Sequence, residues 1–150
     1  MKIEEAIQQP KFDNERHKAL VNILYTHNYL INNISEELKS FDITRQQFNV
    51  LRILKGQHPK GITILLIRER MLDKLSDASR IVDRLQKKGY VNKTASKDDR
   101  RAVTVKISKK GLGLIQRLEP ASSNFNEMLN QLTKKEASLL SDLLDKIRVE

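Results

Sequence analysis

The sequence predicts a mainly α-helical fold that contains a small two-stranded β element. Apolar residues recur at helical spacing along most of the chain, whereas residues 90–107 change to the alternation of a β-strand. No change in composition divides the chain into two parts. With 150 residues and 39% hydrophobic content, we expect one domain, residues 1–150, with one sizeable core.

The N-terminal part is predicted to be an arm followed by a long helix. Residues 1–12 are polar and include Pro10, so we expect this arm to be ordered only if it packs on another segment. The helix is predicted from about residue 14 to residue 40, because apolar residues repeat there at helical spacing. The repeating positions are Leu20, Ile23, Leu24, His27, Leu30, Ile31, Ile34 and Leu38.

Two shorter helices follow, and each begins at a residue that can cap it. Thr44 and Gln47 have the spacing of a capping box, so they predict a helix that starts there and ends at Gly56. Thr63 is placed to cap the next helix, which extends to Met71.

A turn over residues 72–74 leads into a fourth helix, and two short helices joined in this way form a helix-turn-helix. Ser76 is the expected N-cap and Gly89 the expected C-terminal stop. One face of this helix is apolar, with Ala78, Ile81, Val82 and Leu85. The opposite face carries Ser76, Arg80, Asp83, Arg84 and Lys87. A packed back and a basic front are typical of a helix that enters a DNA groove.

The chain then changes to period two. Residues 90–94 and 103–107 predict two strands, and the polar tip 95–101 joins them as a hairpin. A helix-turn-helix followed by such a hairpin is a winged helix-turn-helix, here over about residues 44–107. Ser108 begins a fifth helix that we expect Pro120 to bend, and a second capping box at 133–136 begins the last of about six helices.

The positive charge is concentrated in the same part of the chain. The net charge is +9, and residues 68–110 hold 14 Lys and Arg against 6 Asp and Glu. Charge alone leaves nucleic acid, a membrane surface and an acidic partner open. No apolar run approaches the roughly 20 residues that span a bilayer, so we expect a soluble, intracellular protein.

Three blocks of residues, in this order, resemble the multiple antibiotic resistance regulator (MarR) family of bacterial transcription factors. They are Thr44-x-x-Gln47 with Phe48-x-Val50-Leu51, then Ser79-Arg80-x-Val82-Asp83-Arg84-Leu85-x-Lys87-Lys88-Gly89-Tyr90-Val91, then Asp98-Asp99-Arg100-Arg101-Ala102-Val103 through Ser108-x-Lys110-Gly111. The likeness extends from about His17 to Ile147.

The resemblance implies a cytoplasmic bacterial regulator that binds double-stranded DNA as a homodimer. It implies that helices in 13–40 and 108–150 interlock between two subunits, and that a small aromatic or phenolic effector releases a repressor from a palindromic operator. A winged-helix module that binds protein, or DNA without sequence preference, is the alternative. We expect no enzyme activity, because the sequence has no Gly-rich phosphate loop and no cysteine.

The expected DNA-binding residues divide by the part of DNA that they contact. Arg80 and Arg84 are one turn apart, and either can form a bidentate contact with guanine. Ser76, Asp77 and Ser79 lie near the groove and can hydrogen-bond to bases or backbone. The remaining candidates are Lys87, Lys88 and Lys93 for phosphate and Arg100 and Arg101 for the minor groove.

Asp83 is unusual on such a face, because a carboxylate repels phosphate unless a cation neutralises it. In the family, the matching aspartate is associated with a wing arginine. We therefore expect Asp83 to pair with Arg100 or Arg101 and, together with Asp99, to orient the wing.

The expectations for small ligands are weaker. Tyr25, His27 and Tyr29 on the long helix are candidates for an effector pocket, although core or dimer interface is the more common place for such residues. The three histidines have no helical i, i+4 pair, so we predict no metal site, and no cofactor is expected.

Overall fold

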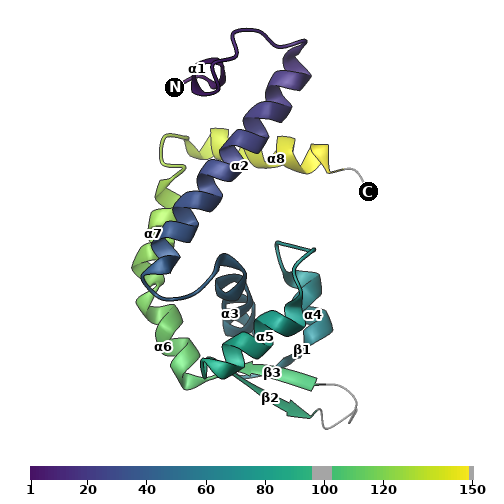
Figure 1. The fold of residues 1–150 in the computed structure, drawn as a ribbon, viewed down its shortest axis with the longest axis vertical. Coiled ribbons are helices and arrows are strands. Elements are labelled where there is room, and N and C mark those ends of the chain that lie inside the picture. Colours follow the sequence, from purple (N-terminus) through teal and green to yellow (C-terminus); the bar gives the residue numbers. More distant parts are fainter. Residues whose placement is uncertain (96–102, 149–150) are drawn as a thin grey trace.

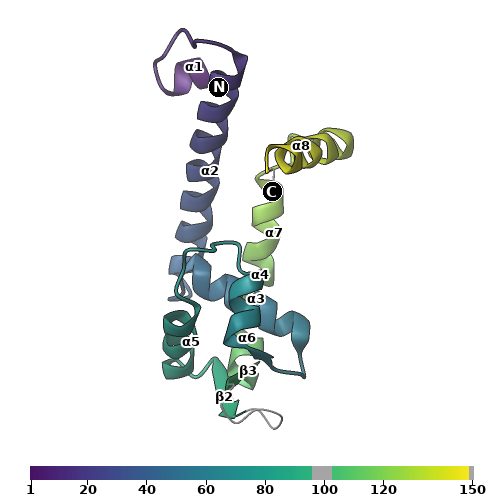
Figure 2. The same ribbon diagram turned by 90° about the vertical axis from the view of Figure 1, so that its right-hand side faces the viewer.

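A computed structural model describes residues 1–95 and 103–148. A winged-helix lobe lies at one end, and a long helix and a second helical segment rise from it side by side (Figures 1 and 2). The described helices are α1 Ile3–Ala6, α2 Glu15–Lys39, α3 Arg45–Gln57, α4 Ile64–Arg70, α5 Ala78–Lys87, α6 Lys109–Arg117, α7 Glu119–Glu127 and α8 Lys134–Ile147. The strands are β1 Ile62–Thr63, β2 Val91–Ala95 and β3 Val103–Ile107.

The predicted helix starts are confirmed at Asn14, Thr44, Thr63, Ser108 and Thr133. Asn14 caps α2 and Thr63 caps α4, each with its side-chain oxygen accepting from a backbone N–H three residues later. Both capping boxes form. The Thr44 hydroxyl accepts from Gln47 N at 3.2 Å and the Gln47 side chain accepts from Thr44 N at 3.1 Å, and Thr133 and Glu136 repeat this arrangement at α8.

The sheet has one strand more than the predicted hairpin. Its order is β1-β3-β2, all antiparallel, and Ile62 of β1 lies opposite Val105 of β3. Val91 of β2 lies opposite Ile107, so β2 and β3 form the wing that was predicted. β1 ties the start of α4 to the wing, which places the helix-turn-helix and the hairpin in one unit.

The chain between Ser108 and α8 differs from the prediction. Instead of one helix bent at Pro120, it forms α6 and α7, which meet at Leu118. Pro120 lies in the first turn of α7, where the missing N–H costs no hydrogen bond because first-turn donors have no partner inside the helix. A new helix start therefore suits this proline better than a bend.

The polar N-terminal arm is ordered because it packs on α2. It forms α1, whose Ile3 is buried, and the Lys18 ammonium of α2 lies 2.6 Å from the Glu4 carboxylate. Hydrogen bonding to Lys18 lowers the pKa of Glu4 below its ordinary value. This contact places the N-terminus at the end of α2 that is far from the wing (Figure 1).

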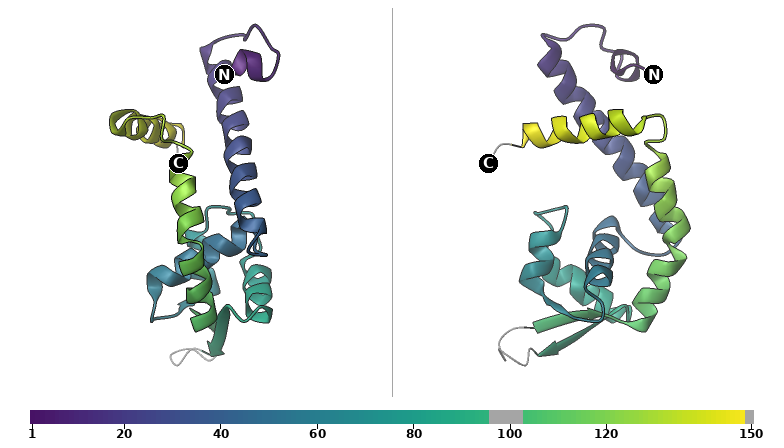
Figure 3. Two further views of the ribbon diagram at one scale, coloured as in Figure 1. Left: turned by 90° about the vertical axis from the view of Figure 1, so that its left-hand side faces the viewer. Right: turned by 180° about the vertical axis from the view of Figure 1, so that it is seen from behind.

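The core fills the winged-helix lobe. Its fully buried side chains include Leu51 and Leu54 of α3, Ile67 of α4, and Val82 and Leu85 of α5. In contrast, α8 has no buried residue. It leaves the far end of α7 and stands apart from α2 (Figures 2 and 3).

Candidate nucleic-acid interface

The α5 helix separates an apolar back from a charged front, as predicted. Ala78, Val82 and Leu85 are buried against α3 and α4, and Ile81 is half-buried. The exposed positions are Ser79, Arg80, Asp83, Arg84, Gln86 and Lys87. The front of α5 is therefore free to meet a ligand while its back is fixed by the core.

The N-cap of α5 is Asp77 rather than Ser76. The Asp77 carboxylate accepts a hydrogen bond from Arg80 N at 3.1 Å and lies 3.3 Å from the Arg80 guanidinium. The Ser76 hydroxyl instead donates to the Asp73 carboxylate at 2.6 Å, so it is not available to cap. This hydrogen bond, with one from Leu75 N, lowers the pKa of Asp73 below its ordinary value.

Gly89 ends α5 as the sequence predicts. Its φ of +76° is a left-handed conformation that glycine adopts without the penalty of a Cβ atom. Gly89 N donates to Gln86 O and Tyr90 N donates to Leu85 O, both at 2.9 Å, which is the Schellman pattern. The chain then turns directly into β2.

The Ser108-x-Lys110-Gly111 motif holds the end of α5. The Ser108 hydroxyl donates to Gly89 O at 2.7 Å and accepts from Gly111 N at 3.0 Å, so it joins the end of one helix to the start of another. Gly111 lies so close to Tyr90 that an added Cβ would be 2.3 Å from its carbonyl oxygen. The start of α6 thus fixes the C-terminal end of α5.

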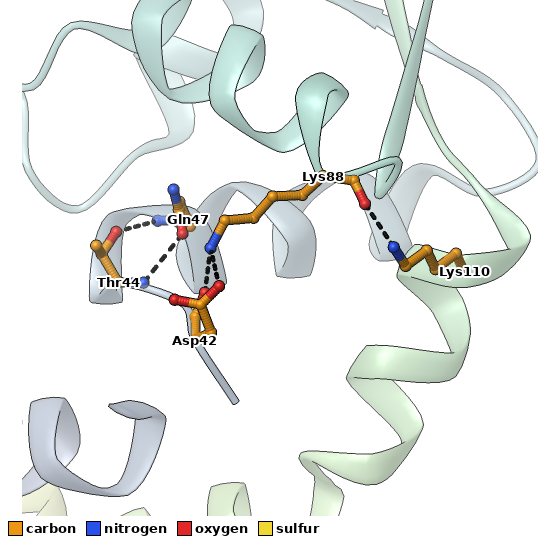
Figure 4. Close-up of polar contacts among 5 residues, drawn as sticks. All are labelled: Asp42, Thr44, Gln47, Lys88 and Lys110. Atoms are coloured by element: carbon orange, nitrogen blue, oxygen red, sulfur yellow. Dashed lines mark hydrogen bonds and ion pairs between the residues drawn. The ribbon is translucent and has the colours of Figure 1, made fainter. Parts of the chain in front are cut away.

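Lys88 connects α5 to the loop between α2 and α3 (Figure 4). Its ammonium donates to the Asp42 carbonyl oxygen and lies 2.9 Å from the Asp42 carboxylate. Asp42 itself has a left-handed φ of +53°, and Thr44 with its capping box follows two residues later. From the other side, the Lys110 ammonium donates to Lys88 O at 2.8 Å. We name the Asp42–Lys88 contact the hinge pair.

Asp83 pairs with Lys93 of β2. The expected partners Arg100 and Arg101, together with Asp99, lie outside the described residues, so that pairing stays a prediction. Lys93 is half-buried, and its ammonium donates to the Asp83 carboxylate. Asp83 therefore links α5 to the wing through Lys93, for which the sequence predicts a phosphate contact.

The turn before α5 contains features that sequence reasoning missed. Asn49 of α3 accepts a hydrogen bond from Leu72 N at 3.0 Å, and Asp73 accepts one from Leu75 N at 3.1 Å. Leu75 itself is 98% exposed. It lies three residues before Ala78, at the spacing of the apolar face, but α5 begins only after Asp77, so helical spacing does not apply there. Identifying Asp77 as the N-cap places Leu75 in the turn rather than on the apolar face of α5.

An apolar cavity of about 320 Å³ lies between the winged-helix lobe and the helices that rise from it. Ile31 and Ile34 of α2, Phe48 of α3 and Phe125 of α7 line it, with Arg45 and Arg52 among the polar residues of its wall. The predicted pocket residues lie elsewhere. Tyr25 and Tyr29 line a separate hollow of about 140 Å³ beside α1, and His27 is exposed.

Within residues 1–95 and 103–148, no group of three or more His, Cys, Asp or Glu residues could hold a metal ion. Among the helices of the same ranges, none is long and apolar enough to cross a membrane.

The comparisons with known proteins agree on one family. The MarR family model matches residues 43–103. PrsX, a transcriptional regulator of Escherichia coli, is 28% identical over 93% of this chain and 85% of its own length. A helix-turn-helix transcriptional regulator of Bacillus cereus is 30% identical over 75% of both chains.

Two solved structures extend the likeness to the fold. A cysteine-to-serine variant of Escherichia coli MarR, complexed with operator DNA, superposes with a TM-score of 0.78 and 25% identity over 93% of this chain and 99% of its own. The organohalide-sensing regulator RdhR, with 2,4-dichlorophenol bound, has a TM-score of 0.78 and 27% identity over 90% of this chain and 80% of its own. The chain is a DNA-binding transcriptional regulator with a winged-helix fold, and it belongs to the MarR family.

Proposed function

We propose that the protein is a homodimeric repressor that binds a palindromic operator by sequence and is released by a small-molecule effector in the bacterial cytoplasm. The observation that carries the proposal is the exposed, basic front of α5 on an apolar back that packs against the core, with Arg84 having no acidic partner among the described residues. The relative bound to operator DNA supports the same role.

Each subunit covers one half-site. We assign base contacts to Arg80 and Arg84, because the major groove, roughly 12 Å wide, admits a helix whose exposed arginines can pair with guanine. Asp77 holds Arg80 in place at the start of α5. Ser76, Ser79 and Lys87 are assigned to hydrogen bonds and phosphate contacts along the same face.

The remaining candidate residues join α5 to its surroundings. Lys88 and Lys93 already have acidic partners in Asp42 and Asp83. If either lysine contacts a phosphate, its positive charge is divided between that phosphate and the carboxylate. We propose that their main role is to orient the helix and the wing. Arg100 and Arg101, with Asp99 beside them, are proposed to reach the minor groove from the wing tip.

Exposed apolar residues supply the proposed dimer interface. Leu20 and Leu24 of α2 and Leu139, Leu143 and Ile147 of α8 are each at least half exposed in the single chain. Apolar faces of this extent on two helices mark a contact surface. Two-fold pairing places two α5 helices about one DNA turn apart, roughly 34 Å, which requires a palindromic operator. We therefore propose residues 44–107 as the DNA-binding part and the helices of 13–40 and 108–150 as the dimerisation part of one domain.

The cavity between α2, α3 and α7 is the proposed effector site. Its volume and apolar walls suit a small aromatic molecule, and the guanidinium groups of Arg45 and Arg52 suit a phenolate or carboxylate on that molecule. The organohalide-sensing relative that holds 2,4-dichlorophenol supports this chemical class. The wall includes Leu72 and Asp73, which precede α5, so a bound molecule can move the helix that contacts DNA.

Selection of bound duplexes from a random pool tests the proposal. We expect one recovered sequence with two-fold symmetry and half-sites about one turn apart. Titrations of that sequence and of random duplexes at several salt concentrations then distinguish a sequence-specific regulator from a module that binds DNA without sequence preference. Equal affinity for both duplexes, with a steep salt dependence alone, would instead identify an architectural module without sequence preference.

A further inference from the structure

Leu75 is an exposed apolar side chain on a turn whose backbone is hydrogen-bonded to Asp73. Its side chain is 98% exposed, although moving a leucine side chain out of water is favourable. The backbone beneath it is held by Asp73, whose carboxylate accepts from Leu75 N at 3.1 Å and from the Ser76 hydroxyl at 2.6 Å. These hydrogen bonds hold the backbone of the turn so that the leucine side chain faces solvent.

The surroundings of Leu75 suit DNA. A hollow of about 460 Å³ between α4 and the start of α5 is lined by Leu75, Leu65 and the first residues of α5. The cations Arg68 and Lys74 lie on the same wall. Arg68 and Lys74 in this wall can be attracted to negatively charged phosphates, and Leu75 can pack on an apolar group. DNA offers both, since its base edges carry apolar groups close to the phosphates.

We propose that Leu75 is a specificity-determining residue that packs on the C5-methyl group of a thymine in the major groove. The thymine methyl is the apolar group among the base edges of that groove, and apolar side chains are its usual contacts. Leu75 lies two residues before the N-cap of α5, and the N-terminal residues of a recognition helix are the ones that contact base edges. The inference rests on the proposed function, in which α5 enters the major groove.

Leu72 provides a matched control. It belongs to the same turn and is 87% exposed, but it lines the cavity between α2, α3 and α7 rather than the hollow beside α5. A substitution of Leu72 therefore removes a similarly exposed leucine from the turn without removing the proposed methyl contact, and the comparison is made without effector because Leu72 lines the proposed effector cavity.

The test replaces thymine by deoxyuridine in the selected operator, one symmetric pair of positions at a time, which removes only the methyl group. Kd is measured by fluorescence anisotropy for the full-length wild type, Leu75→Ala, Leu75→Met and Leu72→Ala. At one pair of positions we expect wild type to lose about four-fold in affinity for each half-site, the effect of one methyl-sized group returned to water. Leu75→Ala should bind the thymine operator more weakly and be insensitive to deoxyuridine there, whereas Leu75→Met and Leu72→Ala should keep the methyl preference.

Four results would overturn the inference. A selected operator that tolerates deoxyuridine at every position, or a Leu75→Ala variant that keeps the full methyl preference, would refute it and leave the proposed function intact. A change in the sedimentation mass of Leu75→Ala would place the leucine in a protein interface instead. A random pool that yields no preferred sequence would refute the proposed function and this inference together.

Discussion

At the residue scale, the start of α5 depends on the carboxylate of Asp73 in the preceding turn. Ser76 and Asp77 are adjacent and both can cap a helix, so spacing alone does not choose between them. The choice depends on Asp73, which takes the Ser76 hydroxyl and leaves Asp77 to cap. Asp83 needed a cation, as predicted, but the partner in the described residues is Lys93 across the helix–strand junction.

Arg84 is predicted to recognise a base rather than only phosphate. Arg84→Ala should weaken binding to the selected operator by about 1–3 kcal/mol and weaken binding to random duplexes far less. Lys87→Ala, on the same exposed face, should weaken both alike and lower the salt slope by about one unit. Equal losses for Arg84→Ala on the two duplexes would contradict its assignment as a base contact. Anisotropy titrations at several salt concentrations supply both values.

Asp73 predicts an acid-dependent loss of stability. Its pKa in the folded protein lies below its ordinary value of 3.8, mainly because the Ser76 hydroxyl donates to the carboxylate. The folded state therefore favours the charged form, and this stabilisation is present above the ordinary pKa and is lost as pH falls through the folded value. In urea unfolding, Asp73→Asn should be less stable than wild type at pH 7, with the difference shrinking below about pH 4. Ser76→Ala should show the same trend, and a difference independent of pH would refute the assignment.

At the element scale, most helices were predicted because their ends are marked by caps in the sequence itself. The strand β1 was not predicted, because two residues are too few to show the alternation of apolar and polar side chains. In addition, its partner β3 lies about forty positions later in the chain. The break between α6 and α7 was missed for a related reason. Pro120 is compatible with a bend and with a new start, and tertiary packing at Leu118 decides between them.

The hinge pair is predicted to set the angle of α5 against the loop that follows α2. Lys88→Met and Asp42→Asn should each weaken operator binding, with the smaller loss for Asp42→Asn because the Lys88 hydrogen bond to the Asp42 carbonyl oxygen remains. The double variant should be no weaker than Lys88→Met, since that substitution already removes the whole contact. Asparagine tolerates the left-handed conformation that Asp42 adopts, so the Asp42→Asn variant preserves the backbone. If Lys88 acted only through phosphate, Asp42→Asn would not weaken operator binding, because it removes a negative charge, and the salt slope would fall only for Lys88→Met. Circular dichroism checks that each variant is folded.

At the scale of the whole molecule, the winged-helix lobe contains a buried core. In contrast, α8 and the part of α2 far from the wing bury few or no side chains. The sequence shows leucines at helical spacing in all of these segments, and spacing is the same for a core and for an interface. Only the exposure of Leu139 and Leu143, 57% and 50%, separates the two cases. The proposed dimer is therefore supported by the fold rather than by the pattern.

The double variant Leu139→Glu/Leu143→Glu is predicted to be monomeric. Two carboxylates on the apolar face of α8 cannot be buried in an interface without a large desolvation cost. Sedimentation equilibrium should give the mass of one chain for the double variant and of two chains for wild type. The monomeric variant should also bind the operator more weakly. Ser141→Glu, an exposed residue between them, should stay dimeric. A dimeric double variant would remove α8 from the proposed interface.

The division of α5 into a packed back and an exposed front has an evolutionary consequence. The side chains that hold the helix are Ala78, Val82 and Leu85, and its C-terminal end is fixed by Gly89 and Ser108. None of these belongs to the front. Substitutions of front residues such as Ser79, Arg84 and Lys87 can therefore accumulate without loss of the fold, whereas Asp83 is held by its contact with Lys93. A duplicated copy of this chain can thus change its exposed face in single steps, each of which remains a folded protein.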